Sequence, residues 1–237
     1  MIVGDDYVMS ISTSRIDSHA HIGLRRGRAG RHLLQQPDTH SDCGSAVTLQ
    51  TRSRILEVAV QLYRRLGHRK TTVIDIAHEI SMSPANCYRF FRSKQAIKEA
   101  VVGKLLEQVV VAALGAARSA SSATVQLQAV LQEIERLHTN RFMQDKSLHD
   151  LVATAMRENW TSVRPYVEGI ESVVAQVIAD GQAHGEFRNG DSMTVARCVL
   201  ATTDFCTNPL LIGANASYAR PTSSQMLAFC VGGLREV

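Results

Sequence analysis

Apolar residues recur at helical spacing between Thr71 and Lys94, in two short runs separated by a break. Thr72 can cap the first run, because its hydroxyl can accept a hydrogen bond from a free N–H group at a helix start. Ser83 followed by Pro84 marks a second start, since proline at the first helical position loses no hydrogen bond. The pattern therefore predicts two short helices joined by a turn. The apolar positions of the first are Val73, Ile74, Ile76, Ala77 and Ile80.

The second of these helices is expected to have one face that packs and one that stays available. Cys87, Phe90 and Phe91 can turn inward, whereas the remaining positions are small, polar or long hydrogen-bond donors: Ala85, Asn86, Tyr88 and Arg89. Two helices joined by a turn of three or four residues, the second with such a face, form a helix-turn-helix. That motif can place its second helix in the major groove of DNA.

The same helical period continues along most of the chain. Apolar residues make up 45% of the sequence and aromatic residues only 5%, and alternating strand-like patterns are scarce. This composition predicts an all-α protein with a sizeable core. Besides the two short helices, we expect helices at about 48–66, from 93 through at least 109, and at 125–137, 146–160, 166–184, 193–212 and 223–234.

The segment from Thr51 to about Val102 resembles the DNA-binding domain of the TetR family of bacterial transcriptional repressors. The resemblance is carried by TRSRILEVAVQLYRRLG, TTVIDIA and SPANCYRFFRSKQAIKEAV. It implies an N-terminal helix-turn-helix domain followed by a helical domain for ligand binding and dimerisation. We divide the chain into residues 1–46, an arm expected to be disordered, the DNA-binding domain 47–94, and the C-terminal domain 95–237.

The resemblance also implies which residues contact DNA. Asn86 and Arg89 match positions that read base edges, for which Asn suits adenine and Arg suits guanine. Ala85 stands at a position where the family usually has glycine and the helix approaches closely. Phosphate contacts are expected from Arg52, Thr72, Ser83, Tyr88 and Lys94. Two departures are noted: Ser81 replaces the usual glycine of the turn, and Cys87 replaces an aliphatic residue and would sensitise DNA binding to oxidation if partly exposed.

The distribution of charge agrees with this division. Residues 47–94 contain nine Lys and Arg residues against three acidic residues, whereas residues 95–237 contain twelve against fourteen. Residues 1–46 are balanced, with five Arg and five Asp. A basic excess confined to one segment is the footprint expected of a domain that meets phosphates.

The C-terminal domain is expected to bind a small-molecule inducer and a second copy of the chain. Polar and aromatic side chains between residues 125 and 184 are the candidate ligand contacts: Arg141, Phe142, Met156, Arg157, Trp160 and Tyr166. In the family the last two helices form a four-helix interface in a homodimer, which suits a palindromic operator. A constitutive DNA-binding regulator without a ligand remains an alternative.

One motif in the arm suggests an enzyme. Asp17, His19 and His21 resemble the Asp-x-His-x-His opening of metal-dependent amidohydrolases, but the apolar strand and the αβ repeat which that fold needs are missing. We therefore expect no catalytic site, no metal and no cofactor. The five cysteines are expected to be thiols. With no run of 18 apolar residues and no secretory signal, we expect a cytoplasmic protein that does not span a membrane.

Overall fold

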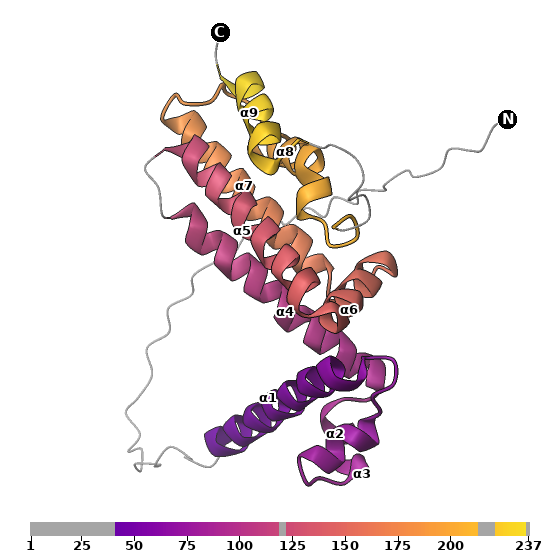
Figure 1. Ribbon diagram of the computed structural model, residues 1–237. Helices are drawn as coiled ribbons and strands as arrows, with labels where there is room; N and C mark the ends of the chain where they lie inside the picture. Colours follow the sequence, from indigo (N-terminus) through magenta and orange to yellow (C-terminus); the bar gives the residue numbers. More distant parts are fainter. Residues whose placement is uncertain (1–40, 119–121, 213–220, 236–237) are drawn as a thin grey trace, which may run out of the picture. The chain divides into compact units, whose positions relative to one another are not determined.

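The computed structural model describes residues 41–118, 122–212 and 221–235, and side chains from Ala46 onward. Within these ranges every regular element is an α-helix, which confirms the all-α prediction (Figure 1). The helices are α1 (Ser41–Leu66), α2 (Val73–Glu79), α3 (Pro84–Phe90), α4 (Lys94–Ala117), α5 (Ala123–Gln144), α6 (Lys146–Arg157), α7 (Arg164–Ala183), α8 (Ser192–Thr207) and α9 (Ser223–Leu234).

Helices α1, α2 and α3 and the first turns of α4 share one apolar core. Ile55 and Tyr63 of α1 are fully buried against Ile76 of α2, Cys87 of α3 and Ile97 of α4. The same core continues into α6, through its buried residues Leu148, Leu151, Val152 and Ala155. The three-helix module and α6 therefore pack as one body.

The helix starts in this module follow the capping pattern predicted from the sequence. The Thr72 hydroxyl accepts a hydrogen bond from the Asp75 N–H at 3.1 Å, and the Asp75 carboxylate accepts one from the Thr72 N–H at 2.7 Å. Ser83 caps α3 by accepting from the Asn86 N–H at 3.2 Å, with Pro84 as the first helical residue. Ser81 has a φ of 56°, the left-handed conformation expected where the family has glycine.

Several helix ends differ from the predicted ones. Helix α1 begins at Ser41 rather than near Thr48, because the residues before Thr48 carry no apolar pattern that would reveal a helix. Helix α5 continues to Gln144, and α6 already ends at Arg157. Helix α8 ends at Thr207 rather than near 212, since Asn208 precedes a proline and adopts an extended conformation (ψ 120°).

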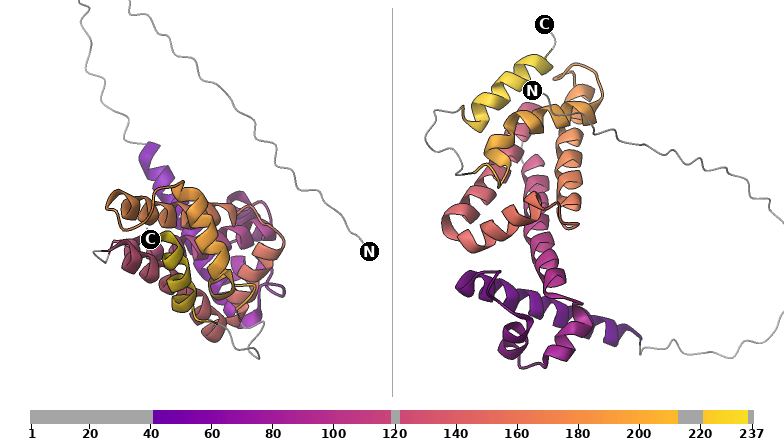
Figure 2. Two further views of the ribbon diagram at one scale, coloured as in Figure 1. Left: turned by 90° about the horizontal axis from the view of Figure 1, so that it is seen from above. Right: turned by 90° about the vertical axis from the view of Figure 1, so that its right-hand side faces the viewer.

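Helix α4 connects the two halves of the described chain. Its first half contributes Val101 and Leu106 to the core of the module, and its second half contributes Val109 and Ala113 to a second core. That second core is built with α5, α7, α8 and α9 (Figure 2). Among the described residues, α4 is the one helix long and apolar enough by length and composition to cross a membrane. Its buried residues, such as Val101 and Val109, pack in the two cores, whereas Val111 and Leu114 are exposed.

The start of α5 is held by the turn that follows α7. Gly185 has a φ of +70° and reverses the chain, which brings the Glu186 carboxylate to the N-terminus of α5. There it accepts hydrogen bonds from the N–H groups of Ala123 at 2.6 Å and Thr124 at 2.9 Å. Phe187 then inserts beside Gly181 of α7. This turn therefore fixes α5 against α7, and both helices contribute to the cavity described below.

Candidate functional site

Helix α3 presents the surface that the helix-turn-helix pattern predicts. Ala85, Tyr88 and Arg89 are exposed, with 47% of Tyr88 accessible, while Cys87 on the opposite side is fully buried. Asn86 is half-buried at the first turn. Tyr88 is therefore a surface residue. Burial raises the pKa of the Cys87 thiol and removes the exposure that an oxidation-sensitive cysteine at this position requires.

The two cationic residues among the predicted phosphate contacts, Arg52 and Lys94, make hydrogen bonds inside the module, as Thr72 and Ser83 do through their caps. The Arg52 Nη1 donates to the Phe90 carbonyl oxygen at 2.7 Å, and its guanidinium lies 4.2 Å from the centre of the Phe91 ring. The Lys94 Nζ donates to the Arg69 carbonyl oxygen at 2.7 Å. Arg52 thus fastens α1 to the end of α3, and Lys94 fastens α4 to the loop before α2. From the sequence no role was predicted for that loop, in which Arg69 and Lys70 are exposed.

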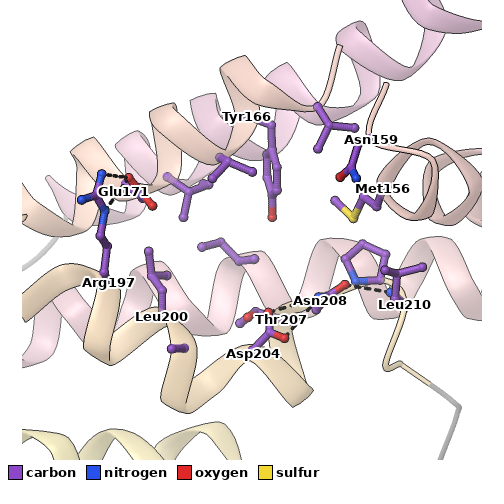
Figure 3. A pocket seen from close by; sticks show the side chains of 16 residues that line it. Met156, Asn159, Tyr166, Glu171, Arg197, Leu200, Asp204, Thr207, Asn208 and Leu210 are labelled. Atoms are coloured by element: carbon purple, nitrogen blue, oxygen red, sulfur yellow. Dashed lines mark hydrogen bonds and ion pairs between the residues drawn. The ribbon is translucent and has the colours of Figure 1, made fainter. Parts of the chain in front are cut away.

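A cavity of about 390 Å³ lies between α5, α7, α8 and the residues that follow α8 (Figure 3). Its volume is within the range typical of small-molecule sites. Most of its wall is apolar, from Ile134 of α5, Val163 before α7, Ile170 of α7 and Leu200 of α8. Polar groups enter from Tyr166, Asp204 and Asn208, and from the ion pair between Glu171 and Arg197.

The Tyr166 hydroxyl belongs to a buried polar network behind the cavity wall. It lies 3.0 Å from Nε2 of His138, whose Nδ1 lies 3.2 Å from Nη1 of Arg141. Arg141 also donates from Nη2 to the Leu105 carbonyl oxygen of α4 at 3.2 Å. Burial, aided by the charge of Arg141, lowers the pKa of His138 to about 3, so this imidazole is neutral.

The opposite wall carries a carboxylate held by an amide. Both carboxylate oxygens of Asp204 accept from Nδ2 of Asn208 at 3.2 Å, and the Asn208 Oδ1 accepts from the Leu210 N–H at 2.9 Å. At the far end of the cavity Arg197 donates to Glu171 at 3.0 and 3.1 Å, joining α8 to α7 (Figure 3).

Of the six ligand contacts predicted from the sequence, the structure brings Met156 and Tyr166 together at this cavity. The other four lie elsewhere. Arg141 is in the network behind the wall, and Phe142 packs edge-on against His149 with ring centres 4.9 Å apart. Arg157 is exposed and lines a separate groove beside the loop that joins α1 to α2. Trp160 is buried in the core of the module, and its Nε1 donates to Glu158 at 2.8 Å.

The prediction missed the contribution of α8 to this cavity. Arg197, Asp204 and Asn208 lie beyond residue 184, outside the range in which ligand contacts were predicted. One available signal was the Asn208-Pro209 pair, which marks a helix end and so an exposed polar cluster after an apolar helix. Nothing in the sequence shows which face of α8 meets α7.

Two family models match the chain. Residues 55–101 match the model of bacterial regulatory proteins of the tetR family, and residues 123–222 match the tetracyclin repressor-like C-terminal domain. The first match covers the helix-turn-helix and the second covers the cavity-forming helices. The chain belongs to the TetR family. It is a DNA-binding transcriptional regulator with the fold of that family.

One curated relative matches part of the chain in sequence, and solved structures share its fold at low sequence identity. An uncharacterized HTH-type transcriptional regulator, YvkB of Bacillus subtilis, is 38% identical over 65 residues, which are 24% of this chain and 34% of YvkB. The match therefore spans about a third of that relative. A tetR-family regulator from Mesorhizobium loti aligns with a TM-score of 0.58 at 16% identity, over 78% of this chain and 93% of its own. FadR of Bacillus subtilis, solved with stearoyl-CoA, gives 0.57 at 16% identity, over 77% and 99%.

The histidines of the possible amidohydrolase motif, His19 and His21, lie outside the residues that the structure describes. Within the described ranges of this TetR-family chain, no three His, Cys, Asp or Glu side chains are grouped so that they could hold a metal ion. Two of the described histidines have contacts inside the fold: His138 is in the Tyr166 network and His149 packs on Phe142.

Proposed function

We propose that this TetR-family regulator is a repressor that binds a palindromic operator as a homodimer and is released when a small molecule fills the cavity. The observation that carries the proposal is that α4 connects the helix-turn-helix to the helices around a ligand-sized cavity. Residues of α4 belong to the apolar core of the helix-turn-helix and also to the second core, which α5, α7, α8 and α9 form. A change in the cavity wall can therefore reach the DNA-binding module through packed helices.

On DNA, the exposed face of α3 supplies base recognition. Arg89 can donate two hydrogen bonds to a guanine and Asn86 can pair with an adenine, while Ala85 lets the helix approach closely. Tyr88, Thr72 and Ser83 lie on the same module and contact phosphates. Lys94 joins them, because its ammonium group has three donors and only one of them is used by the Arg69 carbonyl. The helix N-termini beside Thr72 and Ser83 add a favourable field for phosphate.

The second copy of the chain is expected to cover the outer face of α8 and α9. Phe229 of α9 is 78% exposed and borders an apolar groove, and a contiguous exposed apolar surface is typical of an interaction site. A groove beside it is lined by Val199 of α8 and by the small residues Ala228, Gly232 and Gly233 of α9. Small residues let helices of two copies approach closely, and a two-fold pair matches a palindrome.

Release from DNA follows from differential binding. A ligand shifts the protein away from DNA only if it binds more tightly to the conformation in which the two α3 helices are not spaced for successive major grooves. The cavity wall is connected to α4 through Arg141, which donates to the Leu105 carbonyl oxygen. We expect repression rather than activation, because a regulator that leaves the operator on binding its ligand would then allow transcription. Its site of action is the bacterial cytoplasm.

The test is selection of bound duplexes from a random library by the full chain at physiological salt. The expected product is an inverted repeat whose half-sites are about 34–36 Å apart, one helical turn. Arg89→Ala should lose roughly 1–3 kcal/mol on the selected operator and relax the preference at one base position. The matched control is Arg118→Ala, since Arg118 is exposed at the end of α4.

Two results would contradict the proposal. Binding without an enriched motif, lost steeply as salt rises, would leave only electrostatic attraction to phosphates. A selected operator that no compound from a small-molecule panel displaces, with no compound raising the melting temperature, would favour the constitutive regulator instead. Transcription from the selected operator, measured with and without the protein, decides between repression and activation.

A further inference from the structure

The hydrogen-bond network behind the cavity wall determines which group is the donor in the hydrogen bond between His138 and Tyr166. Arginine has only donors, so the His138 Nδ1, 3.2 Å from Arg141, must be the acceptor of that contact. The neutral imidazole therefore carries its hydrogen on Nε2 and donates it to the Tyr166 oxygen at 3.0 Å. His138 is fully buried, so no solvent competes for either nitrogen.

With its oxygen accepting from His138, the Tyr166 hydroxyl keeps its own hydrogen for another partner. In Figure 3 this hydroxyl points into the cavity, toward the wall formed by α8. Within the described part of the chain, its recorded hydrogen bond is the one to His138. Tyr166 is therefore a donor that faces the cavity.

Asp204 supplies the complementary acceptor on the other wall. Its carboxylate receives hydrogen bonds from the Asn208 amide, and no cation of the described residues forms an ion pair with it. Two carboxylate oxygens have about four acceptor sites, so capacity remains for a ligand. Arg197, which also lines the cavity, is paired with Glu171.

From this pair of groups we infer the chemical class of the ligand: an uncharged, mainly apolar molecule carrying a hydroxyl group, whose oxygen accepts from Tyr166 and whose hydrogen is donated to Asp204. The inference rests on the proposed function, because it concerns the same cavity. A hydroxyl is the small group that accepts and donates at one atom, as these two opposed partners require. The apolar wall takes the rest of the molecule.

Other head groups satisfy only one partner. A carboxylate or phosphate accepts from Tyr166 but meets the negative charge of Asp204 in an apolar surrounding, where like charges repel strongly. Arg141 does not relieve this repulsion, since it lies behind His138 and its guanidinium donates to His138 and Leu105. An ammonium group pairs with Asp204 but has no acceptor for the Tyr166 hydrogen. A ketone accepts from Tyr166 and leaves Asp204 without a donor.

The experiment compares head groups on fixed apolar frames. The probes are 1-adamantanol, 2-adamantanone, 1-adamantanecarboxylate and 1-adamantylammonium, and the alcohol, carboxylate and ammonium of an n-decyl chain. Affinity for the full-length protein is measured by calorimetry at pH 7. On both frames the alcohol should bind roughly tenfold or more tightly than either charged probe, and 1-adamantanol should bind several-fold more tightly than the ketone.

Variants then assign the preference to the two residues. Tyr166→Phe should weaken binding of the alcohols roughly tenfold, and Asp204→Asn should narrow or remove the preference for alcohol over carboxylate. The matched control is Tyr63→Phe, since Tyr63 is buried in the core of the DNA-binding module and does not line the cavity. This control should keep the wild-type ranking. Thermal melting of each variant verifies that it is folded.

Three outcomes overturn the inference: tightest binding by a carboxylate or an ammonium probe, unchanged alcohol affinity in Tyr166→Phe, or no binding of any probe on either frame. These outcomes are separate from failure of the proposed function. A carboxylate that binds tightly and displaces the protein from its operator leaves the proposed function intact and removes only the hydroxyl preference. Absence of a selected operator removes the proposed function, whatever the ranking of the head groups.

Discussion

The Arg64 guanidinium of α1 lies 2.5 Å from the Asp145 carboxylate, at the junction between α5 and α6. Asp145 also ends α5, since its N–H donates to the Arg141 carbonyl oxygen, and it caps α6 by accepting from the Leu148 N–H at 3.2 Å. The same helix, α5, carries His138 and Arg141 of the network behind the cavity. A single ion pair thus connects the DNA-binding module to the helix that forms part of the cavity wall.

Loss of the Arg64–Asp145 ion pair should reduce the effect of ligand on operator affinity more than it reduces the stability of the fold. In Arg64→Gln the free energy of unfolding should fall by less than about 1 kcal/mol, because 58% of the Arg64 side chain is exposed and such pairs are screened by water. The ligand-induced change in operator affinity should fall several-fold, since the α5–α6 junction no longer holds α1. The measurement is operator affinity with and without saturating ligand.

Arg65→Gln is the matched control for this prediction. Arg65 is adjacent, equally exposed, and pairs at 3.5 Å with Glu79 inside the DNA-binding module, so its loss leaves the junction intact. Equal loss of ligand response in the two variants would show that the Arg64–Asp145 pair has no particular part in coupling.

Two glycines in long helices should respond to alanine in opposite directions. A Cβ at Gly181 would lie 2.4 Å from Cδ2 of Phe187 and 2.7 Å from Cβ of Ala123, both in the second core. Gly181→Ala should therefore destabilise the protein by about 1–3 kcal/mol through overpacking. A Cβ at Gly115 of α4 meets nothing within 4 Å, so Gly115→Ala should stabilise by about 0.5–1 kcal/mol. Denaturant unfolding of both variants tests the pair, and a stabilised Gly181→Ala would contradict the packing of Phe187.

Stability should fall in acid partly through Glu186. Partial burial of its carboxylate opposes ionisation, but hydrogen bonds from Thr124 and from the Ala123 N–H outweigh burial and hold the pKa of Glu186 below its usual value. A lowered folded-state pKa contributes stability that is present above the unfolded pKa of about 4.3 and is lost as pH falls through the folded pKa. Wild type should therefore be more stable than Glu186→Gln at pH 7, and the gap should close below about pH 4.

The control for this pH dependence is Glu107→Gln, because Glu107 is exposed on α4. Its unfolding free energy should differ little from that of wild type at either pH. A gap between wild type and Glu186→Gln that is the same at pH 7 and in acid would mean that the side chain stabilises α5 without its charge.

The DNA-binding module could be predicted from sequence because its signals are local. Thr72 and Ser83 cap helix starts through hydrogen bonds from residues three positions away, Pro84 suits the first helical position, and Gly67 ends α1 with a φ of +85°. Even the strained Ser81 was expected, since the turn demands a left-handed residue. The start of α1 was missed because the residues before Thr48 have no apolar period.

The cavity could be predicted only in part because it depends on helices distant in sequence. Tyr166 and Asp204 come from α7 and α8, and their opposition is set by how the two helices pack. Trp160 shows the converse: an aromatic residue near cationic residues suggested a ligand contact, but its ring is buried in the core of the module, 4.8 Å from Nζ of Lys98. Composition identifies such residues as candidates, and tertiary packing decides which of them meet.

Arg52 provides a test of whether a residue expected to contact phosphate instead holds the module together. Its guanidinium donates to the Phe90 carbonyl oxygen and lies over the Phe91 ring, so Arg52→Gln removes a hydrogen bond and a cation–π contact at the end of α3. We expect a loss of about 1–2 kcal/mol in the free energy of unfolding. The salt dependence of operator binding should stay unchanged, because no phosphate contact is removed.

Arg54→Gln is the control for the loss of one positive charge, because Arg54 is exposed and lies two residues further along α1. A salt slope reduced by about 1 in Arg52→Gln but not in Arg54→Gln would assign Arg52 to a phosphate after all.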